Sequence, residues 1–157
     1  MVEKMKYLIL ENIRSAYNVG AIFRTADGAG VGKIFLVGYT PQPTDRFGRE
    51  QNEIEKTSLG AAKTVPWEYV ETGKEAIKKC QAEGFMVAAV EQTKKSVPLK
   101  DFSPPEKVVY ILGNEVKGVE EKTIALSDVV VELPMLGDKE SLNVSVAAGI
   151  IMYRDLV

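Results

Sequence analysis

The first side chains in this sequence that could do chemistry lie in residues 11–20 and the helix-like stretch that follows. Arg14, Asn18 and Arg24 all come shortly after an apolar stretch. A guanidinium can anchor a phosphate or stabilise a developing negative charge, and a neighbouring amide can orient it. The same spacing also allows Asn18 to be a helix cap and Arg24 to be an ordinary solvated charge. The residues alone leave both interpretations open.

Two later turns also combine polar groups with sharp changes of chain direction. Glu115 lies between two glycines directly after an apolar stretch, where the backbone must approach another group closely. It could be a site acid or only a charge at a helix N-terminus. The loop of residues 134–143 contains Ser141, which could act in the site or cap the following helix. The small apolar run 144–149 allows close packing of another backbone, as in a core.

The composition excludes several kinds of catalysis. The sequence has no histidine, which rules out Ser-His-Asp and Cys-His mechanisms. It also has no Cys or His cluster with metal-ligand spacing and no phosphate-binding loop, so we expect no metal catalysis. The single cysteine, Cys80, lies in a helix-like stretch and is expected to be structural. The formal net charge of −2 means that any contact with RNA must be local.

Apolar stretches alternate with stretches of helical spacing, which predicts an α/β fold with a mainly parallel sheet flanked by helices. The ligand site of such a sheet lies beyond the carboxyl ends of its strands, where the three polar turns fall. We expect a single domain over residues 1–157 and, from the lack of a signal peptide or membrane span, a cytoplasmic protein. The predicted strands are 6–10, 33–37, 65–69, 85–90, 108–112 and 129–133, the predicted helices are 15–29, 72–82, 119–126 and 142–156, and residues 38–55 form a long loop.

The three turns together resemble the motifs of the SpoU (TrmH-like) branch of the SPOUT methyltransferases. The resemblance covers nearly the whole chain, in the family's order and spacing. It implies the SPOUT fold, with a deep trefoil knot formed by roughly the last third of the chain, and a homodimer that packs the first and last helices against their copies. The matching segments are Asn18-x5-Arg24, Leu112-Gly-Asn-Glu115, Leu133-Pro-Met135 and Ser141-Leu-Asn-Val-Ser-Val-Ala147.

The resemblance also implies an enzyme that transfers a methyl group from S-adenosylmethionine to a ribose 2′-hydroxyl of a structured RNA. In this family the loops of the knot hold the cofactor mostly through backbone groups. The expected cofactor-binding residues are Val90, Leu112, Gly113, Leu133, Met135 and Leu142. The expected catalytic residues are Asn18, Arg24, Glu115, Ser141 and Asn143.

Arg24 is the residue to which the resemblance assigns activation of the hydroxyl. A guanidinium holds its proton above about pH 12 and cannot normally act as a base, so we expect it to anchor phosphate and stabilise the developing alkoxide. Asn18 and Asn143 are expected to orient Arg24 and the loops. Glu115 is expected to fix the second loop or the Arg24 guanidinium, and Ser141 to order the third loop.

Cationic residues near the first motif predict contact with the RNA backbone. Acidic residues alternate with them in the long loop, so an ordinary solvated loop is an equal alternative. The minimal chain length favours tRNA over rRNA as substrate. The alternative function is a non-catalytic knotted protein that binds RNA or assists ribosome or tRNA assembly. The expected RNA-binding residues are Arg14, Arg24, Arg46, Arg49, Lys56 and Lys63.

Overall fold

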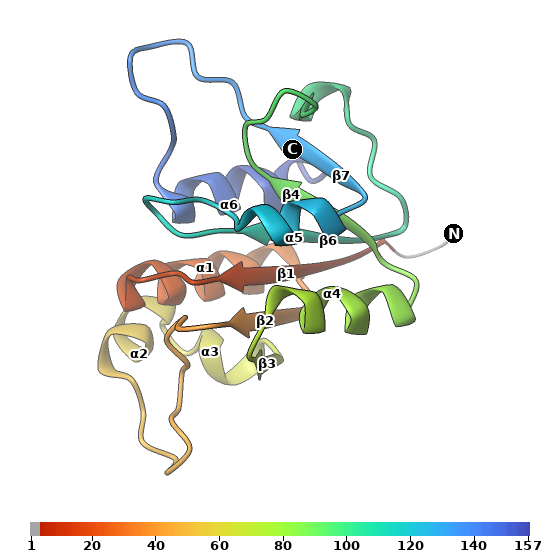
Figure 1. The fold of residues 1–157 in the computed structure, drawn as a ribbon. Helices are drawn as coiled ribbons and strands as arrows, with labels where there is room; N and C mark the ends of the chain where they lie inside the picture. The colour runs from red at the N-terminus through yellow and green to blue at the C-terminus, as the bar shows by residue number, and fades with distance from the viewer. Residues whose placement is uncertain (1–3) are drawn as a thin grey trace.

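The computed structural model of the protein describes residues 4–157 and contains one seven-stranded sheet (Figure 1). Every strand pairing in it is parallel, in the order β3-β2-β1-β6-β4-β7-β5. This confirms the predicted α/β fold with a parallel sheet flanked by helices. The strands are β1 (Met5–Glu11), β2 (Lys33–Val37), β3 (Trp67–Val70), β4 (Met86–Val90), β5 (Val97–Pro98), β6 (Lys107–Leu112) and β7 (Val129–Glu132).

The helices cover both faces of the sheet. The face formed by Leu8, Leu36 and Tyr110 packs against α1, α2, α3 and α6, and the face formed by Ile9 and Ile111 packs against α4 and α5. Strand residues are apolar on both faces because both faces are covered. The helices are α1 (Ala16–Ala29), α2 (Asn52–Ser58), α3 (Ala61–Thr64), α4 (Gly73–Ala82), α5 (Glu121–Leu126) and α6 (Val144–Tyr153), and a short 3-10 helix covers Leu99–Asp101.

One predicted loop proves to be partly helical. Residues 38–55 were expected to lack secondary structure, but α2 begins at Asn52 within that range. The side chain of Gln51 accepts hydrogen bonds from the backbone nitrogens of Glu53 and Ile54, 2.7 and 3.2 Å away, and so caps the helix. Glutamine is a less usual cap than Ser, Thr, Asp or Asn, and Ile54 is the only apolar residue of α2, so the pattern gave little sign of a helix.

The strand order creates a switch point at the centre of the sheet. From β1 the chain builds outward through β2 to β3, and then crosses to the other side to form β4, β6 and β7. The carboxyl ends of β4, β6 and β7 therefore lie together at one edge, where the rule for parallel sheets places a ligand. The trefoil knot implied by the family resemblance stays a prediction.

Two further expectations bear on the helices. Cys80 is buried on α4, and burial raises the pKa of its thiol to about 12, so it behaves as a small apolar side chain. No helix in residues 4–157 has both the length and the apolar character needed to cross a membrane.

Candidate functional site

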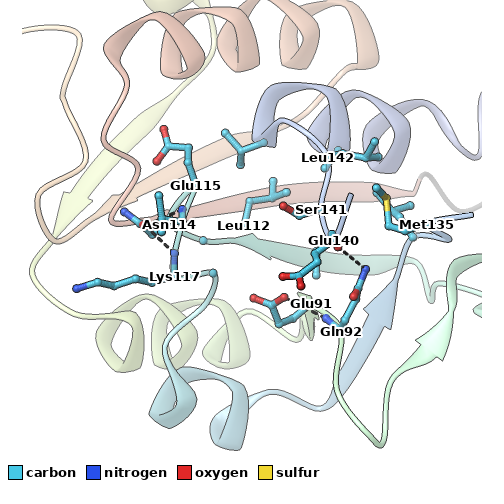
Figure 2. Close-up of a pocket in the computed structure, with 17 residues that line it drawn as sticks. Glu91, Gln92, Leu112, Asn114, Glu115, Lys117, Met135, Glu140, Ser141 and Leu142 are labelled. Atoms are coloured by element: carbon cyan, nitrogen blue, oxygen red, sulfur yellow. Dashed lines mark hydrogen bonds between the residues drawn. The ribbon is translucent and has the colours of Figure 1, made fainter. Parts of the chain in front are cut away.

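A cavity of about 290 Å³ lies at the carboxyl ends of β4, β6 and β7, next to the first turn of α6 (Figure 2). The segments that follow these three strands form its walls. All six expected cofactor-binding residues line it, namely Val90, Leu112, Gly113, Leu133, Met135 and Leu142. Binding of a cofactor by these residues stays a prediction. The other lining residues are Glu91, Gln92, Asn114, Glu115, Val116, Lys117, Gly118, Glu140, Ser141, Val144 and Ala147.

The turn of residues 113–118 folds back on itself at the end of β6. Asn114 and Gly118 exchange backbone hydrogen bonds of 3.1 and 2.8 Å. A Cβ atom on Gly113 would lie 2.3 Å from both the carbonyl carbon of Gly118 and the amide nitrogen of Val119, far inside van der Waals contact. Only glycine fits there, and the wall of the cavity at this point is therefore main chain.

Asn114 fastens this turn to two neighbouring segments. Its side-chain oxygen accepts hydrogen bonds from the backbone nitrogens of Val116 and Lys117, both at 2.9 Å. Its Nδ2 donates to the carbonyl oxygen of Asn12 at 2.9 Å and to the hydroxyl of Tyr39 at 3.0 Å. The residue is buried. Asn114 was not among the expected site residues, although it belongs to one of the three polar turns.

Glu115 joins the same turn to the start of α1. Its Oε1 accepts a hydrogen bond from the backbone nitrogen of Arg14 at 2.9 Å. Its Oε2 accepts from the backbone nitrogen of Ser15 at 3.0 Å and from Nδ2 of Asn18 at 3.2 Å. Burial acts to raise the pKa of Glu115, but these hydrogen bonds outweigh it and hold the pKa below its ordinary value. An ionised carboxylate thus ties the first and second motifs together.

The structure shows which groups Glu115 contacts and which residue caps α1. Glu115 contacts Asn18 and the backbone before α1, and no hydrogen bond links it to the guanidinium of Arg24 in the described residues. Asn18 does not occupy the helix cap, because Ser15 does: its Oγ accepts from the backbone nitrogen of Asn18 at 3.1 Å. Asn18 lies inside the helix, and its amide is free to reach across to the second motif.

Ser141 does not cap α6. The cap is Asn143, whose Oδ1 accepts hydrogen bonds from the backbone nitrogens of Ser145 and Val146 at 2.8 and 3.4 Å. The helix begins two residues later than a cap at Ser141 would require, so Ser141 remains in the loop and lines the cavity. Its hydroxyl makes no hydrogen bond with residues 4–157, and its side chain is exposed.

Arg24 lies outside the cavity of its own chain. Its side chain is exposed on α1, and within residues 4–157 it forms neither a salt bridge nor a side-chain hydrogen bond. Of the expected catalytic residues, the structure brings Glu115 and Ser141 to the cavity and Asn18 to Glu115. Asn143 lies beside the cavity as the cap of α6. Residues 4–157 do not bring all five of these residues into contact with one another.

Besides Asn114, the polar residues Glu91, Gln92, Lys117 and Glu140 line the cavity although the sequence did not single them out. The Oε1 of Glu91 accepts from the backbone nitrogen of Val119 at 3.0 Å, which holds the far end of the second turn. Gln92 donates from Nε2 to the carbonyl oxygen of Glu140 at 3.0 Å and so joins the loop after β4 to the third loop (Figure 2). Glu91 and Gln92 directly follow a predicted strand, and the same carboxyl-end rule would have found them.

The buried carboxylate of Glu11, at the end of β1, binds the segment that follows the second turn. Its Oε1 accepts from the backbone nitrogen of Glu120 at 2.9 Å, and its Oε2 accepts from the hydroxyl of Thr123 at 2.5 Å. Burial raises the pKa of Glu11, and the two hydrogen bonds only partly oppose that effect. This carboxylate fixes the start of α5, just beyond the second turn.

The cations of the expected RNA-binding set fall into two groups. Lys63 forms salt bridges with Glu50 and Glu55 at 3.2 and 3.3 Å, and Arg49 forms one from Nε to Asp45 at 2.7 Å. These two cations are partly neutralised by the acidic residues of the same region. The others are exposed and make no salt bridge with residues 4–157, namely Arg14, Arg24, Arg46 and Lys56. The part of the chain described here also holds no cluster of three or more potential metal-binding side chains.

Comparison with known proteins identifies relatives of this fold and cavity. The SpoU rRNA Methylase family matches residues 5–153. A tRNA (guanosine(18)-2′-O)-methyltransferase from Aquifex aeolicus is 31% identical over 97% of this chain and 70% of its own length. The 23S rRNA (guanosine-2′-O-)-methyltransferase RlmB from Neisseria meningitidis is 31% identical over 92% of this chain, which spans only 55% of that relative.

Solved structures agree with the sequence comparison. An AdoMet-bound rRNA methyltransferase from Sinorhizobium meliloti superposes with a TM-score of 0.87 at 29% identity, over 99% of this chain and 58% of that one. The TrmH/SpoU tRNA modifying enzyme of A. aeolicus gives a TM-score of 0.80 at 29% identity, over 97% of this chain and 75% of that one. With nearly its whole length matched by the family and its sheet and cavity arranged as described above, the chain belongs to the SpoU rRNA methylase family.

Proposed function

We propose that the protein transfers a methyl group from S-adenosylmethionine to a ribose 2′-hydroxyl of a structured RNA. One observation carries this proposal: in a member of the SpoU family, the second and third motifs form the walls of one cavity at the carboxyl ends of β4, β6 and β7. The first motif is tied to this cavity through Glu115. The named relatives include methyltransferases of tRNA and of 23S rRNA.

The residues of the cavity fit S-adenosylmethionine. Leu112, Leu133 and Met135 provide an apolar wall for a purine ring, and the main chain at Gly113 allows close approach. The lining also includes the carboxylate of Glu91, which favours a cationic ligand. When bound, the cofactor supplies an electrophilic methyl group on a sulfonium. The chain's own task is then to hold the ribose hydroxyl in line and to stabilise its developing charge.

The carboxylate and amide groups of the site hold its loops in position. Glu115 and Asn18 hold the start of α1 against the second turn, and Asn114 holds that turn against Asn12. Ser141, exposed on the third loop, is available to the RNA or the cofactor. We assign to Arg24 the anchoring of an RNA phosphate and the stabilisation of the developing alkoxide.

A homodimer completes this assignment. Arg24 is exposed and outside the cavity of its own chain, so a second copy is the natural source of a guanidinium for each cavity. Exposed apolar side chains lie on the two helices concerned: Tyr17 is 60% exposed on α1, and Val146 and Ile150 are 51% and 43% exposed one turn apart on α6. The two helices pack side by side in the chain, and such a surface favours association with a copy of itself.

Of the two RNA classes we propose tRNA. The match to the tRNA methyltransferase of A. aeolicus covers 97% of this chain, against 92% for the rRNA methyltransferase of N. meningitidis. The exposed cations Arg14, Arg46 and Lys56 lie on the segments around the first motif and α2, where they can contact the RNA backbone.

The direct test is methyl transfer from radiolabelled S-adenosylmethionine to bulk tRNA and, separately, to rRNA, followed by nucleoside analysis for 2′-O-methylation. Label in tRNA that is lost with Arg24→Ala supports the proposal in full. Label in rRNA alone contradicts the choice of tRNA. Cofactor binding without transfer to either RNA favours a non-catalytic RNA-binding or assembly protein, and absence of cofactor binding by calorimetry contradicts the role of the cavity.

Subunit mixing tests whether Arg24 acts across the dimer. Arg24→Ala protein and a variant with a closed cavity, Gly113→Val, should each be inactive alone. If each cavity uses the guanidinium of the other subunit, unfolding and refolding the two together restores about a quarter of the sites, because half of the randomly formed dimers contain one intact site. No recovery in a mixture shown to contain heterodimers would place Arg24 and the cavity of the same chain together.

A further inference from the structure

A turn after β2 presents an aromatic ring and two guanidiniums to solvent. The segment 41–51 leaves the sheet near its β3 edge and projects beyond the body of the molecule (Figure 1). Phe47 at its tip is 68% exposed. The guanidinium carbons of Arg46 and Arg49 lie 4.8 and 5.1 Å from the centre of its ring. No residue of this group lines the cavity.

The turn is an ordered structure. Thr44 and Glu50 pair in an antiparallel bridge at its base. The carboxylate of Asp45 accepts hydrogen bonds from the backbone nitrogens of Phe47 and Arg49 at 2.8 and 3.0 Å, and from Nε of Arg49 at 2.7 Å. These contacts fix the backbone on both sides of the ring. Phe47 is thus held outward without contributing to either apolar core.

The chemistry of the tip fits a nucleotide better than a purely anionic or apolar ligand. Every nucleobase has a π face that stacks on an aromatic ring, and a guanidinium beside the ring can hold the adjoining phosphate. Arg49 uses only Nε toward Asp45 in its salt bridge, and Arg46 makes none with residues 4–157. Since Asp45 offsets one of the two charges, electrostatics alone gives this turn little affinity, and the ring must contribute much of it.

We propose that Phe47, flanked by Arg46 and Arg49, stacks on an unpaired nucleobase of the substrate RNA, at a contact separate from the methyl-transfer cavity. A base inside a duplex is covered on both faces by its neighbours, so the ring selects a base in a loop, a bulge or a single-stranded end. This inference rests on the proposed function, because it takes the ligand to be the RNA that is methylated.

The test compares four variants of the full-length protein in binding to RNA. Phe47→Ala should weaken the affinity for a tRNA pool and for single-stranded oligonucleotides about 5- to 100-fold, which is the range for loss of one stacked base. Phe47→Leu, which keeps apolar bulk without a π face, should lose nearly as much, and Phe47→Trp should bind as well as the wild type. Leu59→Ala removes a side chain of similar exposure from α2's end and should change nothing.

Fluorescence of the Phe47→Trp protein gives a direct readout of stacking. Single-stranded RNA should quench it, and an oligonucleotide of the same length without bases should not. Wild-type affinity in Phe47→Ala would overturn the inference, as would full affinity in Phe47→Leu or an equal loss on blunt duplex RNA. These outcomes are independent of the reaction. Quenching with no methyl transfer to any RNA supports the stacking contact and contradicts the proposed function. Methyl transfer together with wild-type RNA affinity in Phe47→Ala supports the proposed function and contradicts the stacking contact.

Discussion

Replacing Glu115 by glutamine tests whether its charge holds the first motif against the second. The carboxylate accepts three hydrogen bonds, one at Oε1 from the backbone of Arg14 and two at Oε2 from Ser15 and Asn18. A glutamine oxygen can take the place of Oε2 and keep two of them. Its NH₂ group then faces the backbone nitrogen of Arg14, where two donors meet and no bond can form.

The expected loss of stability follows from these three contacts. A hydrogen bond to a charged acceptor contributes about 1 kcal/mol more than its neutral counterpart, so the two weakened bonds cost about 2 kcal/mol. The lost bond costs about 1.5–3 kcal/mol more, which gives about 3.5–5 kcal/mol in all. The backbone nitrogen of Arg14 is exposed and can bind water instead, which favours the lower half of that range. For a chain of this size the melting temperature should fall by about 2–4 °C for each kcal/mol.

The pH dependence of this loss has a definite sign. The pKa of Glu115 lies below its ordinary value of 4.5, so its stabilising effect is complete above that pH. It disappears as the pH falls through the lowered pKa, because the folded carboxylate must then take up a proton. The difference between the wild type and Glu115→Gln should therefore be constant from about pH 5 to 8 and shrink below about pH 4.

Urea unfolding followed by circular dichroism measures this difference, with Glu71→Gln as the matched control. Glu71 is exposed and makes no salt bridge or side-chain hydrogen bond with residues 4–157, so its loss should cost under about 0.5 kcal/mol. A double-mutant cycle with Asn18→Ala should give a coupling of about 0.5–2 kcal/mol. If Glu115→Gln unfolds like Glu71→Gln, the carboxylate does not hold the two motifs together.

Three further substitutions have expected outcomes. Gly113→Ala brings a methyl group to 2.3 Å from backbone atoms. Calorimetry should therefore show weaker cofactor binding, and the free energy of unfolding should fall by about 1–3 kcal/mol. Gly137→Ala, with open space around it, should show neither effect. Arg24→Lys should lower turnover at least about tenfold with unchanged cofactor affinity in a methyl-transfer assay, and near wild-type turnover would remove its assigned role. Glu11→Gln should change the unfolding free energy at pH 7 by less than about 1 kcal/mol. As the pH rises from about 4.5, the unfolding free energy of the wild type should fall relative to that of Glu11→Gln, because the raised pKa of Glu11 makes the folded carboxylate give up its proton less readily than the unfolded one. Parallel pH profiles of the two proteins would contradict the raised pKa.

Six of the seven strands were predictable because each is an apolar run bounded by turn residues. Lys33–Val37 is found at the predicted bounds, and the other predicted strands differ by one or two residues at their ends. Val97–Pro98 was missed because two residues form no pattern, and α2 because its surface is charged and only Ile54 and Ser58 are buried. Local periodicity therefore gives the sheet but not the short elements that depend on tertiary contacts.

The site was predictable as a set of turns but not as a set of contacts. The carboxyl-end rule pointed to the turns of residues 113–118 and 134–143, which now line the cavity, and the family resemblance supplied Leu112, Gly113 and Leu133 as individual positions. Glu115 and Arg14 lie 101 positions apart, and nothing in their spacing shows that a side chain of one accepts from the backbone of the other. The sequence did not identify the helix caps for a related reason. The backbone geometry that makes Ser15 the cap of α1 is set by the residues around it.

Several polar side chains around the cavity hold the backbone of its loops, and Arg24 does not. This difference separates two kinds of functional residue. Glu91, Asn114 and Glu115 each accept a hydrogen bond from backbone nitrogens, and Glu115 does so across widely separated segments. They shape the loops that form the walls, so their loss should lower cofactor affinity and turnover together. Arg24 does not line the cavity and makes no salt bridge or side-chain hydrogen bond within residues 4–157, so its loss should lower turnover alone. The ratio of the two effects in each variant therefore distinguishes residues that build the cavity from the one assigned to the reaction.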